Sequence, residues 1–457
     1  MKRLSPEDHL FLWMERRHQP MHAGGLLLFD LPEGAGRNYL SKTAEQMRQY
    51  PATLAPFNQR LVSAGIGQHG LVLDKTFDID HHFKHLALPK PGRIRELLAL
   101  ISAQHSHLLD RQRPLWELSL IEGIHGKRFA VYAKVHHALM DGIAAMRLFN
   151  NFVSEDPTLT DMPPLWAMPN ASRSKRTSPN NFDQLKQALK LGTRFTQNLT
   201  SITTIGKELN QLLLNTFDSD ESHVGLSAPE SIFNQKITGS RRFAAQSFSF
   251  QRVRALSKKF DCTVNDVVLA MCGGALRSYL LSQNALPKSP LIAIMPVSVR
   301  SPHAQTGGNQ ISMMLASLGT HIENTEQRLH HILNTVKEAK QRINRMSPVE
   351  LQVYAMLSMI PSAIQSFTGK LPALRAFNVM ISNVPGPRKP VYWNGAPLRG
   401  IYPASIVVDD AALNITLTSY ADQIEFGLIA CRRSLPSMQR ILDYLEQSLL
   451  DLEKLAD

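Results

Sequence analysis

Two adjacent histidines followed by an aspartate and a glycine form the most chemically suggestive pattern in this sequence. They are His136, His137, Asp141 and Gly142, with the spacing HHxxxDG. Near pH 7 a neutral imidazole can accept a proton from a hydroxyl or thiol and return it later. A carboxylate or backbone carbonyl normally fixes the orientation of such a ring, and an aspartate four positions on comes close if the loop makes a helix-like turn. The pattern therefore predicts an acid–base site.

Two other interpretations of the pair stay open on the pattern alone. The chain has 17 histidines, and a second pair, His81-His82, lacks the Asp-Gly and is typical of a structural or surface pair. The full pattern is expected by chance only on the order of 10⁻³ times in such a chain. His137 and Asp141 could share a helical face as metal ligands, but adjacent strand residues point to opposite sides, which disfavours His136 as a further ligand. We expect no metal site.

The flanking sequence places the histidines between two rigid elements. Residues 129–135 are mostly apolar, β-branched or aromatic, which predicts a buried strand. Apolar residues from Ile143 to Phe149 then begin a helical pattern. An imidazole at such a junction can reach into a cleft while both elements hold it in place.

The length and patterning predict two domains with a connector. A chain of 457 residues exceeds one ordinary core. We predict an N-terminal domain over 1–160 carrying the motif, a proline-rich linker with a long helix over 161–240, and a C-terminal domain over 241–457. Helices and strands alternate in both domains, which indicates an α/β (α+β) fold.

The second half supplies further strands and a terminal helix. Strands are predicted at 378–382, 404–408, 413–419 and 425–430. The helix carries apolar residues at helical spacing from Met438 to Leu455, and we expect this stripe to pack into the core and not onto a membrane.

The charge limits the possible partners. The net charge is +12 and the sequence pI is about 9.6. The basic residues are scattered without interleaved aromatics, so we expect no nucleic acid partner. An anionic membrane surface, a phosphate-bearing ligand or simply a basic soluble surface would each explain the charge.

Other bulk features point to the cytoplasm. The sequence contains no stretch of about 18 apolar residues, so it predicts no membrane-spanning helix. The N-terminus lacks the apolar segment of a signal peptide, and the three cysteines form no CxxC pair.

Two polar sites in the second half could face the histidines. Asn265 lies in the first turn of a strongly signalled helix, where its amide could donate to an oxyanion or simply cap the helix. Ser382 and Asn383 end a predicted strand before the rigid turn Val384-Pro385-Gly386-Pro387, and could face a cleft. Alone, this second motif is only a turn signal.

The combination and order of the motifs resemble the bacterial wax ester synthase/diacylglycerol acyltransferase family over nearly the whole chain. The motifs are Leu4-Ser5-Pro6-Glu7-Asp8, Pro20-Met21-His22, Pro114-Leu115-Trp116-Glu117, HHALMDG at 136–142, Thr263-Val264-Asn265-Asp266-Val267, Pro296-Val297-Ser298-Val299-Arg300 and Ser382-Asn383-Val384-Pro385-Gly386-Pro387. HHxxxDG alone is shared with the wider superfamily of coenzyme A-dependent acyltransferases and condensation domains. The resemblance implies two chloramphenicol-acetyltransferase-like domains with mixed sheets and an active-site channel between them.

It also implies transfer of a fatty acyl group from acyl-coenzyme A to a long-chain alcohol or diacylglycerol, with no other cofactor. His137 would be the general base, His136 would support it and Asp141 would hold the loop. Asn265 would be the oxyanion donor. Gly142, Ser382 and Asn383 would contribute to substrate binding.

Peripheral association with the inner membrane or lipid inclusions is expected. The alternatives are a condensation-type transferase that uses a carrier-protein thioester, and a non-catalytic lipid-surface binding protein of the same fold.

Overall fold

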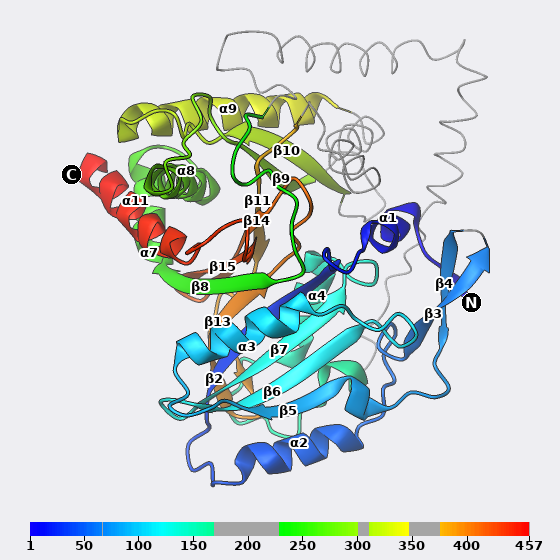
Figure 1. Ribbon diagram of the computed structural model, residues 1–457. Helices are drawn as coiled ribbons and strands as arrows, with labels where there is room; N and C mark the ends of the chain where they lie inside the picture. Colours follow the sequence, from blue (N-terminus) through cyan, green and yellow to red (C-terminus); the bar gives the residue numbers. More distant parts are fainter. Residues whose placement is uncertain (66, 169–227, 300–309, 347–374, 457) are drawn as a thin grey trace.

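The computed structural model describes residues 1–65, 67–168, 228–299, 310–346 and 375–456 (Figure 1). Two six-stranded mixed sheets form its framework, together with a small three-stranded sheet. The long helix predicted in the linker, at about 182–214, lies outside the described residues.

The first large sheet has the order β12-β13-β2-β7-β6-β5. Its central strands β2 and β7 are antiparallel and place His22 opposite His136. The sheet ends at β5, which runs parallel to β6. The strands are β2 (His22–Asp30), β5 (Phe83–Ala87), β6 (Trp116–Ile124), β7 (Arg128–His136), β12 (Tyr392–Trp393) and β13 (Ala396–Ala404), and the helices of this half are α1 (Pro6–Met14), α2 (Tyr39–Gln49), α3 (Ile94–Ser106) and α4 (Gly142–Phe152).

The second large sheet has the order β10-β9-β11-β14-β15-β8. Its β11 is parallel to both neighbours, β9 and β14. The strands are β8 (Arg241–Ser249), β9 (Ile292–Val299), β10 (Gln310–Ser317), β11 (Val379–Pro385), β14 (Leu413–Tyr420) and β15 (Gln423–Cys431), and the helices are α7 (Phe250–Lys259), α8 (Val264–Ser282), α9 (Thr325–Arg345) and α11 (Arg440–Ala456). The small sheet contains β1 (Lys2–Arg3), β3 (Gln59–Gly65) and β4 (Gln68–Leu73).

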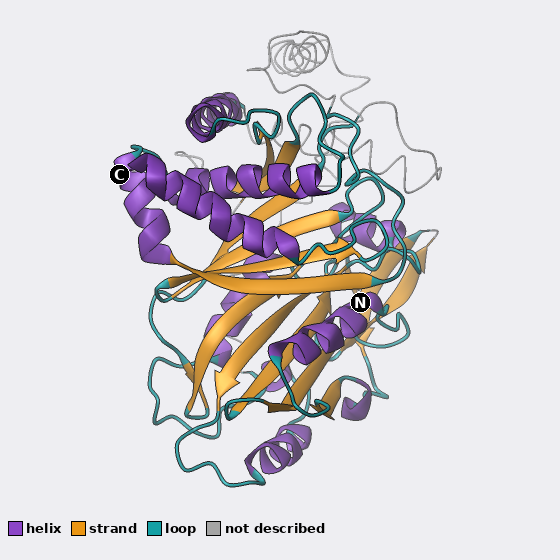
Figure 2. Ribbon diagram, turned by 60° about the vertical axis from the view of Figure 1, so that its left-hand side comes forward, coloured by secondary structure: helices purple, strands orange, loops and turns teal. Residues whose placement is uncertain are grey.

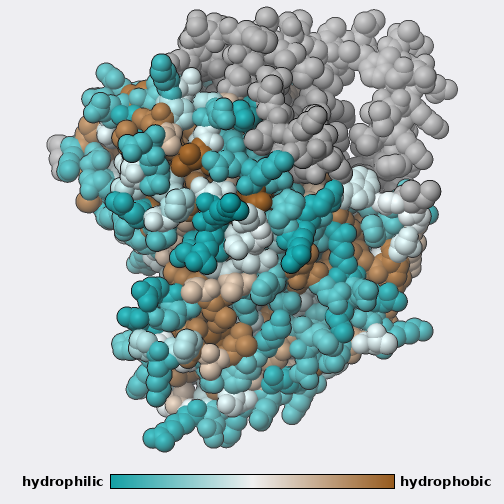
Figure 3. Space-filling view, viewed as in Figure 1, coloured by the Kyte–Doolittle hydropathy of each residue, from teal (hydrophilic) through white to brown (hydrophobic). Residues whose placement is uncertain are grey.

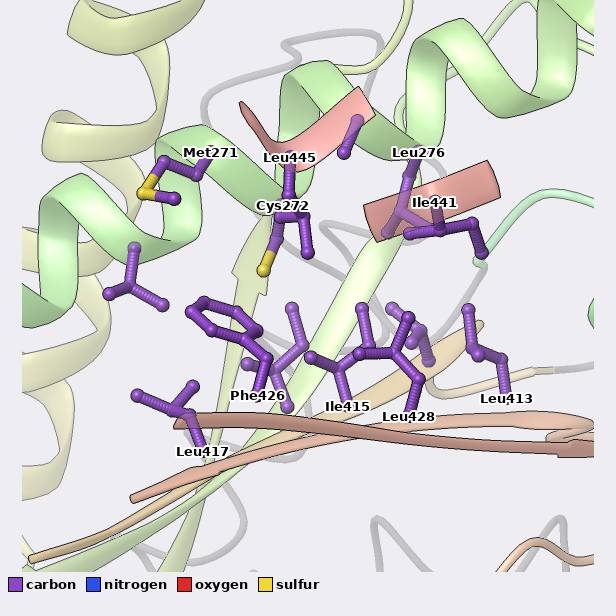
Figure 4. Packing of buried hydrophobic residues seen from close by; sticks show 14 of the residues in the cluster. Met271, Cys272, Leu276, Leu413, Ile415, Leu417, Phe426, Leu428, Ile441 and Leu445 are labelled. Carbon is purple, nitrogen blue, oxygen red and sulfur yellow. The ribbon is translucent and has the colours of Figure 1, made fainter. Parts of the chain in front are cut away.

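Helices cover the outer face of the second sheet (Figures 1 and 2). The residues of the core between α8, α11 and the sheet point toward one another in Figure 4. Since alternate strand residues face opposite sides, the polar residues Asn414, Thr416 and Thr418 of β14 face the first sheet. The labelled core residues are Met271, Cys272, Leu276, Leu413, Ile415, Leu417, Phe426, Leu428, Ile441 and Leu445.

A hairpin from the second half joins the first sheet. Strand β13 pairs antiparallel with β2, and Ala404 lies opposite Gly24. The range 241–457 therefore contributes to both sheets, and the two halves are joined through β13 as well as through packing.

Two helices begin with capping boxes, and one predicted strand is absent. Ser5 and Thr263 each form a capping box, at α1 and α8 respectively. The strand predicted at 404–408 is wrong: β13 covers Ala396–Ala404, and only a bridge between Val408 and Ala411 follows. Residues 406–408 are apolar because they pack against core clusters, whereas Gly400 and Pro403 obscure the pattern of β13.

The terminal helix packs into the core, as predicted. The residues of its apolar face are buried, whereas Leu450 and Leu455 are exposed; the buried residues are Ile441, Leu442, Leu445, Leu449 and Leu452. Across the part of the chain that the structure describes, no helix combines the length and hydrophobicity that a bilayer crossing requires. On the face shown in Figure 3, hydrophilic side chains predominate and the apolar areas between them are small.

Candidate active site

The ring of His137 lies where β7 ends, with the N-terminal helix beside it. The His137 backbone N–H donates to the Met21 carbonyl over 2.8 Å. Its ring stacks on Phe11 of α1, with centroids 4.2 Å apart and planes 25° apart. The backbone bond ties the loop to the start of β2, and the stack fixes one face of the imidazole.

The environment of His137 keeps its imidazole neutral. Burial lowers the pKa of His137 to about 4, while the nearby Asp141 charge acts to raise this pKa and His136 acts to lower it. A hydrogen bond to its own carbonyl also favours the protonated ring. Among the described residues, no other residue hydrogen-bonds this ring, so one nitrogen keeps a free lone pair. A neutral ring with a free lone pair is the form that a general base needs at pH 7.

His136 has a different environment and is fully buried. Its Nδ1 accepts from the Ala138 N–H over 3.1 Å, which places the proton of the neutral ring on Nε2. That nitrogen lies 3.3 Å from Oε1 of Glu15. His136 thus contacts the loop and Glu15 from within, and its supporting role stays a prediction.

Glu15 is a buried carboxylate that the sequence analysis did not identify. Burial acts to raise the pKa of Glu15, but His136 and Arg111 outweigh it, and the pKa lies below its ordinary value. The Arg111 Nε donates to Oε2 over 2.8 Å and the Met21 N–H donates to Oε1 over 3.2 Å. No local sequence pattern links Glu15 to these partners, since Arg111 and His136 come from distant parts of the chain.

Asp141 caps the helix that follows the motif. Its Oδ1 accepts from the Ala144 N–H over 2.7 Å at the start of α4. Within the described ranges Asp141 forms no ion pair. The structure thus shows Asp141 as a helix cap, while its predicted role in holding the loop for catalysis stays a prediction. Gly142 lies close to the second domain, since a Cβ there would be 3.4 Å from Cγ2 of Val384.

Asn265 of α8 and Asn383 of β11 form a hydrogen bond within the second domain. Nδ2 of Asn383 donates to Oδ1 of Asn265 over 2.6 Å, and both side chains are exposed. Thr263, and not Asn265, caps α8, so capping does not account for the Asn265 side chain. In the part of the chain that the structure describes, no hydrogen bond joins Asn265 to His137.

Ser382 lies on the opposite face of β11 from Asn383. By alternation it shares the face of Val384, the residue that approaches Gly142. Ser382 is partly exposed and in register with Thr416 of β14. Ser382 therefore faces the first domain, whereas Asn383 faces α8.

Buried polar groups support the motif from behind. Nε2 of His22 is 2.9 Å from the His105 carbonyl, and Nδ1 of His105 is 2.7 Å from the Tyr132 hydroxyl. Burial lowers the pKa of His105 to about 3 and lowers that of His22 well below its ordinary value. Lys134 is also buried and donates to the carbonyls of Gln104 and His107.

Metal ligation finds no support in this geometry. Over the described ranges, no three histidine, cysteine or carboxylate side chains are arranged to hold an ion. His136 and His137 have separate surroundings, and Asp141 is engaged as a cap.

Comparison with known proteins identifies the family. The wax ester synthase/diacylglycerol acyltransferase catalytic domain matches residues 4–268, and the C-terminal domain of the same family matches residues 307–453. The chain belongs to this family. O-acyltransferase WSD of Acinetobacter baylyi is 45% identical over 453 residues, 98% of this chain and 96% of that one. A probable diacylglycerol O-acyltransferase of Mycobacterium tuberculosis is 40% identical over 466 residues, 99% of each chain.

Solved structures confirm the fold. The wax ester synthase/diacylglycerol acyltransferase from Marinobacter aquaeolei VT8 matches with a TM-score of 0.81 and 48% identity, covering 100% of both chains. The first condensation domain of the CDA synthetase matches with a TM-score of 0.59 at 13% identity, covering 99% of this chain and 96% of that one. The second match shows a shared fold only. The predicted family and α/β fold are thus confirmed, while the roles of individual residues stay predictions.

Proposed function

We propose that this wax ester synthase/diacylglycerol acyltransferase family member transfers a fatty acyl group from acyl-coenzyme A to a long-chain alcohol or to diacylglycerol. The observation that carries the proposal is the neutral His137 ring, held at the end of β7 with one nitrogen free. Full-length relatives named as O-acyltransferases support the reaction class.

The proposed reaction is a direct attack. The free nitrogen of His137 takes the acceptor hydroxyl proton as the oxygen attacks the thioester carbonyl carbon. The carbon–sulfur bond then breaks, and His137 returns the proton to the departing thiolate. An ester and free coenzyme A result, so no acyl-enzyme forms. Because the His137 ring binds protons weakly, it releases the proton readily to a thiolate, which is far more basic.

Asn265 is the proposed donor to the oxyanion that develops in this step. Its Oδ1 accepts from Asn383, which leaves its amide hydrogens available. Asn383 would thereby orient Asn265, and Ser382 would contact substrate from the opposite face of β11. Asp141, as a helix cap, would act on the reaction only through the loop.

The test uses purified protein, palmitoyl-coenzyme A and either hexadecanol or dipalmitoylglycerol. Ester is measured by mass spectrometry and free thiol by a colorimetric reagent. The proposal predicts equal amounts of ester and thiol with at least one acceptor. Thiol release no faster than without protein would favour a non-catalytic lipid-binding protein. Transfer only from a carrier-protein thioester would favour the condensation-type alternative.

The proposed reaction needs no cofactor besides the acyl-coenzyme A co-substrate. EDTA in the same assay should therefore leave the rate unchanged. A rate that falls with EDTA and returns with an added metal ion would contradict this part of the proposal.

We also propose that the protein binds lipid surfaces peripherally. The net charge of +12 supports attraction to anionic phospholipid. Sedimentation with vesicles should show binding to phosphatidylglycerol-containing vesicles that weakens with salt. Equal binding to purely zwitterionic vesicles at every salt concentration would contradict an electrostatic attachment.

A further inference from the structure

The N-terminal helix α1 contacts both histidines of the motif through residues one helical turn apart. Phe11 stacks on the ring of His137 at 4.2 Å, and Glu15, the C-cap of the helix, lies 3.3 Å from Nε2 of His136. Residues four apart lie on the same helix face. One face of α1 therefore supports the motif.

Phe11 is the neighbour that restricts the orientation of the His137 ring, because no other side chain hydrogen-bonds this ring among the described residues. The carboxylate of Asp141 is engaged with the Ala144 N–H. Among the described residues, only the carbonyl of His137 itself hydrogen-bonds the ring. That bond still permits tilting of the ring, which a stacked aromatic neighbour restricts.

Glu15 fixes the backbone beneath the same ring. One carboxylate oxygen accepts from the Met21 N–H, and the Met21 carbonyl accepts from the His137 N–H. The other oxygen is held by Arg111, which also donates to the Leu12 carbonyl of α1. Contacts therefore run from the end of α1 through Met21 to the backbone of His137.

Helix α1 also touches the second domain. Met14 packs in one cluster with Ile292 and Ile294 of β9 and Leu315 of β10, and Phe11 packs against this cluster. Figure 1 shows α1 in dark blue near the ends of both large sheets. The helix is therefore anchored on both sides of the proposed site.

We infer that Phe11 and Glu15 are positioning residues for the proposed acyl transfer. Phe11 orients the ring of His137 and shields it from water, which we call its drying role. Glu15 fixes the backbone of His137. This inference rests on the proposed function, because it assigns a purpose to the orientation of a general base. Neither residue touches the reacting atoms in this role.

The inference predicts an effect of Phe11 on the titration of His137. Burial is the main cause of the lowered His137 pKa. The charged or titratable groups around the ring are Asp141 and His136 of the motif, with Glu15 of α1 and its partner Arg111 behind His136. Replacing Phe11 by serine admits water without changing any of these groups, whereas leucine keeps the site dry but removes the flat stacking surface.

The experiment follows the pH dependence of carbethoxylation of His137 by diethylpyrocarbonate, located by peptide mass spectrometry. The reagent modifies only the unprotonated ring, so the midpoint reports the pKa without requiring turnover. Phe11→Ser should raise the midpoint by about one unit, since burial effects reach several units. Phe11→Leu should leave the midpoint in place but lower kcat by about tenfold with little change in KM, because misorientation slows the reaction step.

Glu15→Gln should also lower kcat more than KM, because glutamine keeps the size but loses the charge that holds Arg111. The matched control is Trp13→Leu, which removes a larger ring from an exposed position of the same helix. Its midpoint and kcat should equal those of the wild type.

A Phe11→Ser midpoint equal to the wild type would overturn the drying role, and wild-type kcat in Phe11→Leu would overturn the orienting role. Wild-type kcat in Glu15→Gln would overturn the backbone-fixing role. An inactive wild type would instead overturn the proposed function, while the carbethoxylation midpoints would still decide the drying role of Phe11.

Discussion

Asn383 Nδ2 donates to Asn265 Oδ1 over 2.6 Å, joining residues 118 positions apart. The bond links the first turn of α8 to the end of β11, two motifs that the sequence analysis selected separately. It also fixes the Asn265 amide with its hydrogens unused, which a donor to a developing oxyanion requires.

Replacing Asn265 tests that role. Asn265→Asp can still accept from Asn383 but loses the amide donors and adds a negative charge. We expect kcat to fall by about 10²-fold or more, with a smaller effect on KM. The unfolding midpoint should stay near wild type, because Thr263 caps the helix. Steady-state kinetics and thermal unfolding measure both quantities, and an active Asn265→Asp enzyme would contradict the oxyanion assignment.

Asp141 is expected to act through helix capping. Asp141→Ala removes the acceptor for the Ala144 N–H and should destabilise the protein by about 1 kcal/mol. Asp141→Asn keeps a good cap, so it should retain both stability and most of the activity. Urea unfolding and turnover are measured on both variants. If Asp141→Asn were stable but inactive, the charge of Asp141 would matter beyond capping.

The buried Glu425 predicts a pH-dependent stability. Burial raises the pKa of Glu425 to about 7, although Ser247 and Tyr402 act to lower this pKa. The folded state therefore binds more protons than the unfolded state between pH 4.5, the ordinary pKa of a glutamate, and about pH 7. The stability contributed by the protonated Glu425 is complete below pH 4.5 and is lost as pH rises through 7.

Glu425→Gln removes this dependence while keeping the shape of the side chain. We expect the variant to match the wild type at pH 4.5 and to exceed its stability by about 1–3 kcal/mol at pH 8. Urea unfolding of both proteins from pH 4.5 to 8 provides the measurement. If the difference in free energy of unfolding between the two proteins were constant across that range, Glu425 would not take up a proton on folding.

The sequence predicted local structure best where single residues determine it. The start of α1 follows from Ser5 as N-cap with proline next to it, and the start of α8 follows from Thr263 and Asp266. The strand before His136 was equally clear, because residues 129–135 are apolar, β-branched or aromatic except for Lys134. The HHxxxDG spacing could indicate a candidate site because its residues are close in the chain.

Contacts between distant residues could not be predicted in the same way. Nothing near Glu15 indicates that its carboxylate faces His136, since only the folding of the N-terminal domain brings these two distant residues together. The strand β13 was missed because Gly400 and Pro403 interrupt its alternation. The pairing of Asn265 with Asn383 likewise depends on the order of strands in the second sheet.

The central claim is that His137 is the base for direct acyl transfer, and the most direct test is the rate of thiol release in His137→Ala. Palmitoyl-coenzyme A and the preferred acceptor are supplied in excess, and the exposed His125→Ala serves as the matched control. We expect His137→Ala to remain folded, with a rate about 10²–10⁴-fold lower, while His125→Ala keeps the wild-type rate. A folded His137→Ala protein that releases thiol and forms ester at near the wild-type rate would contradict the assignment.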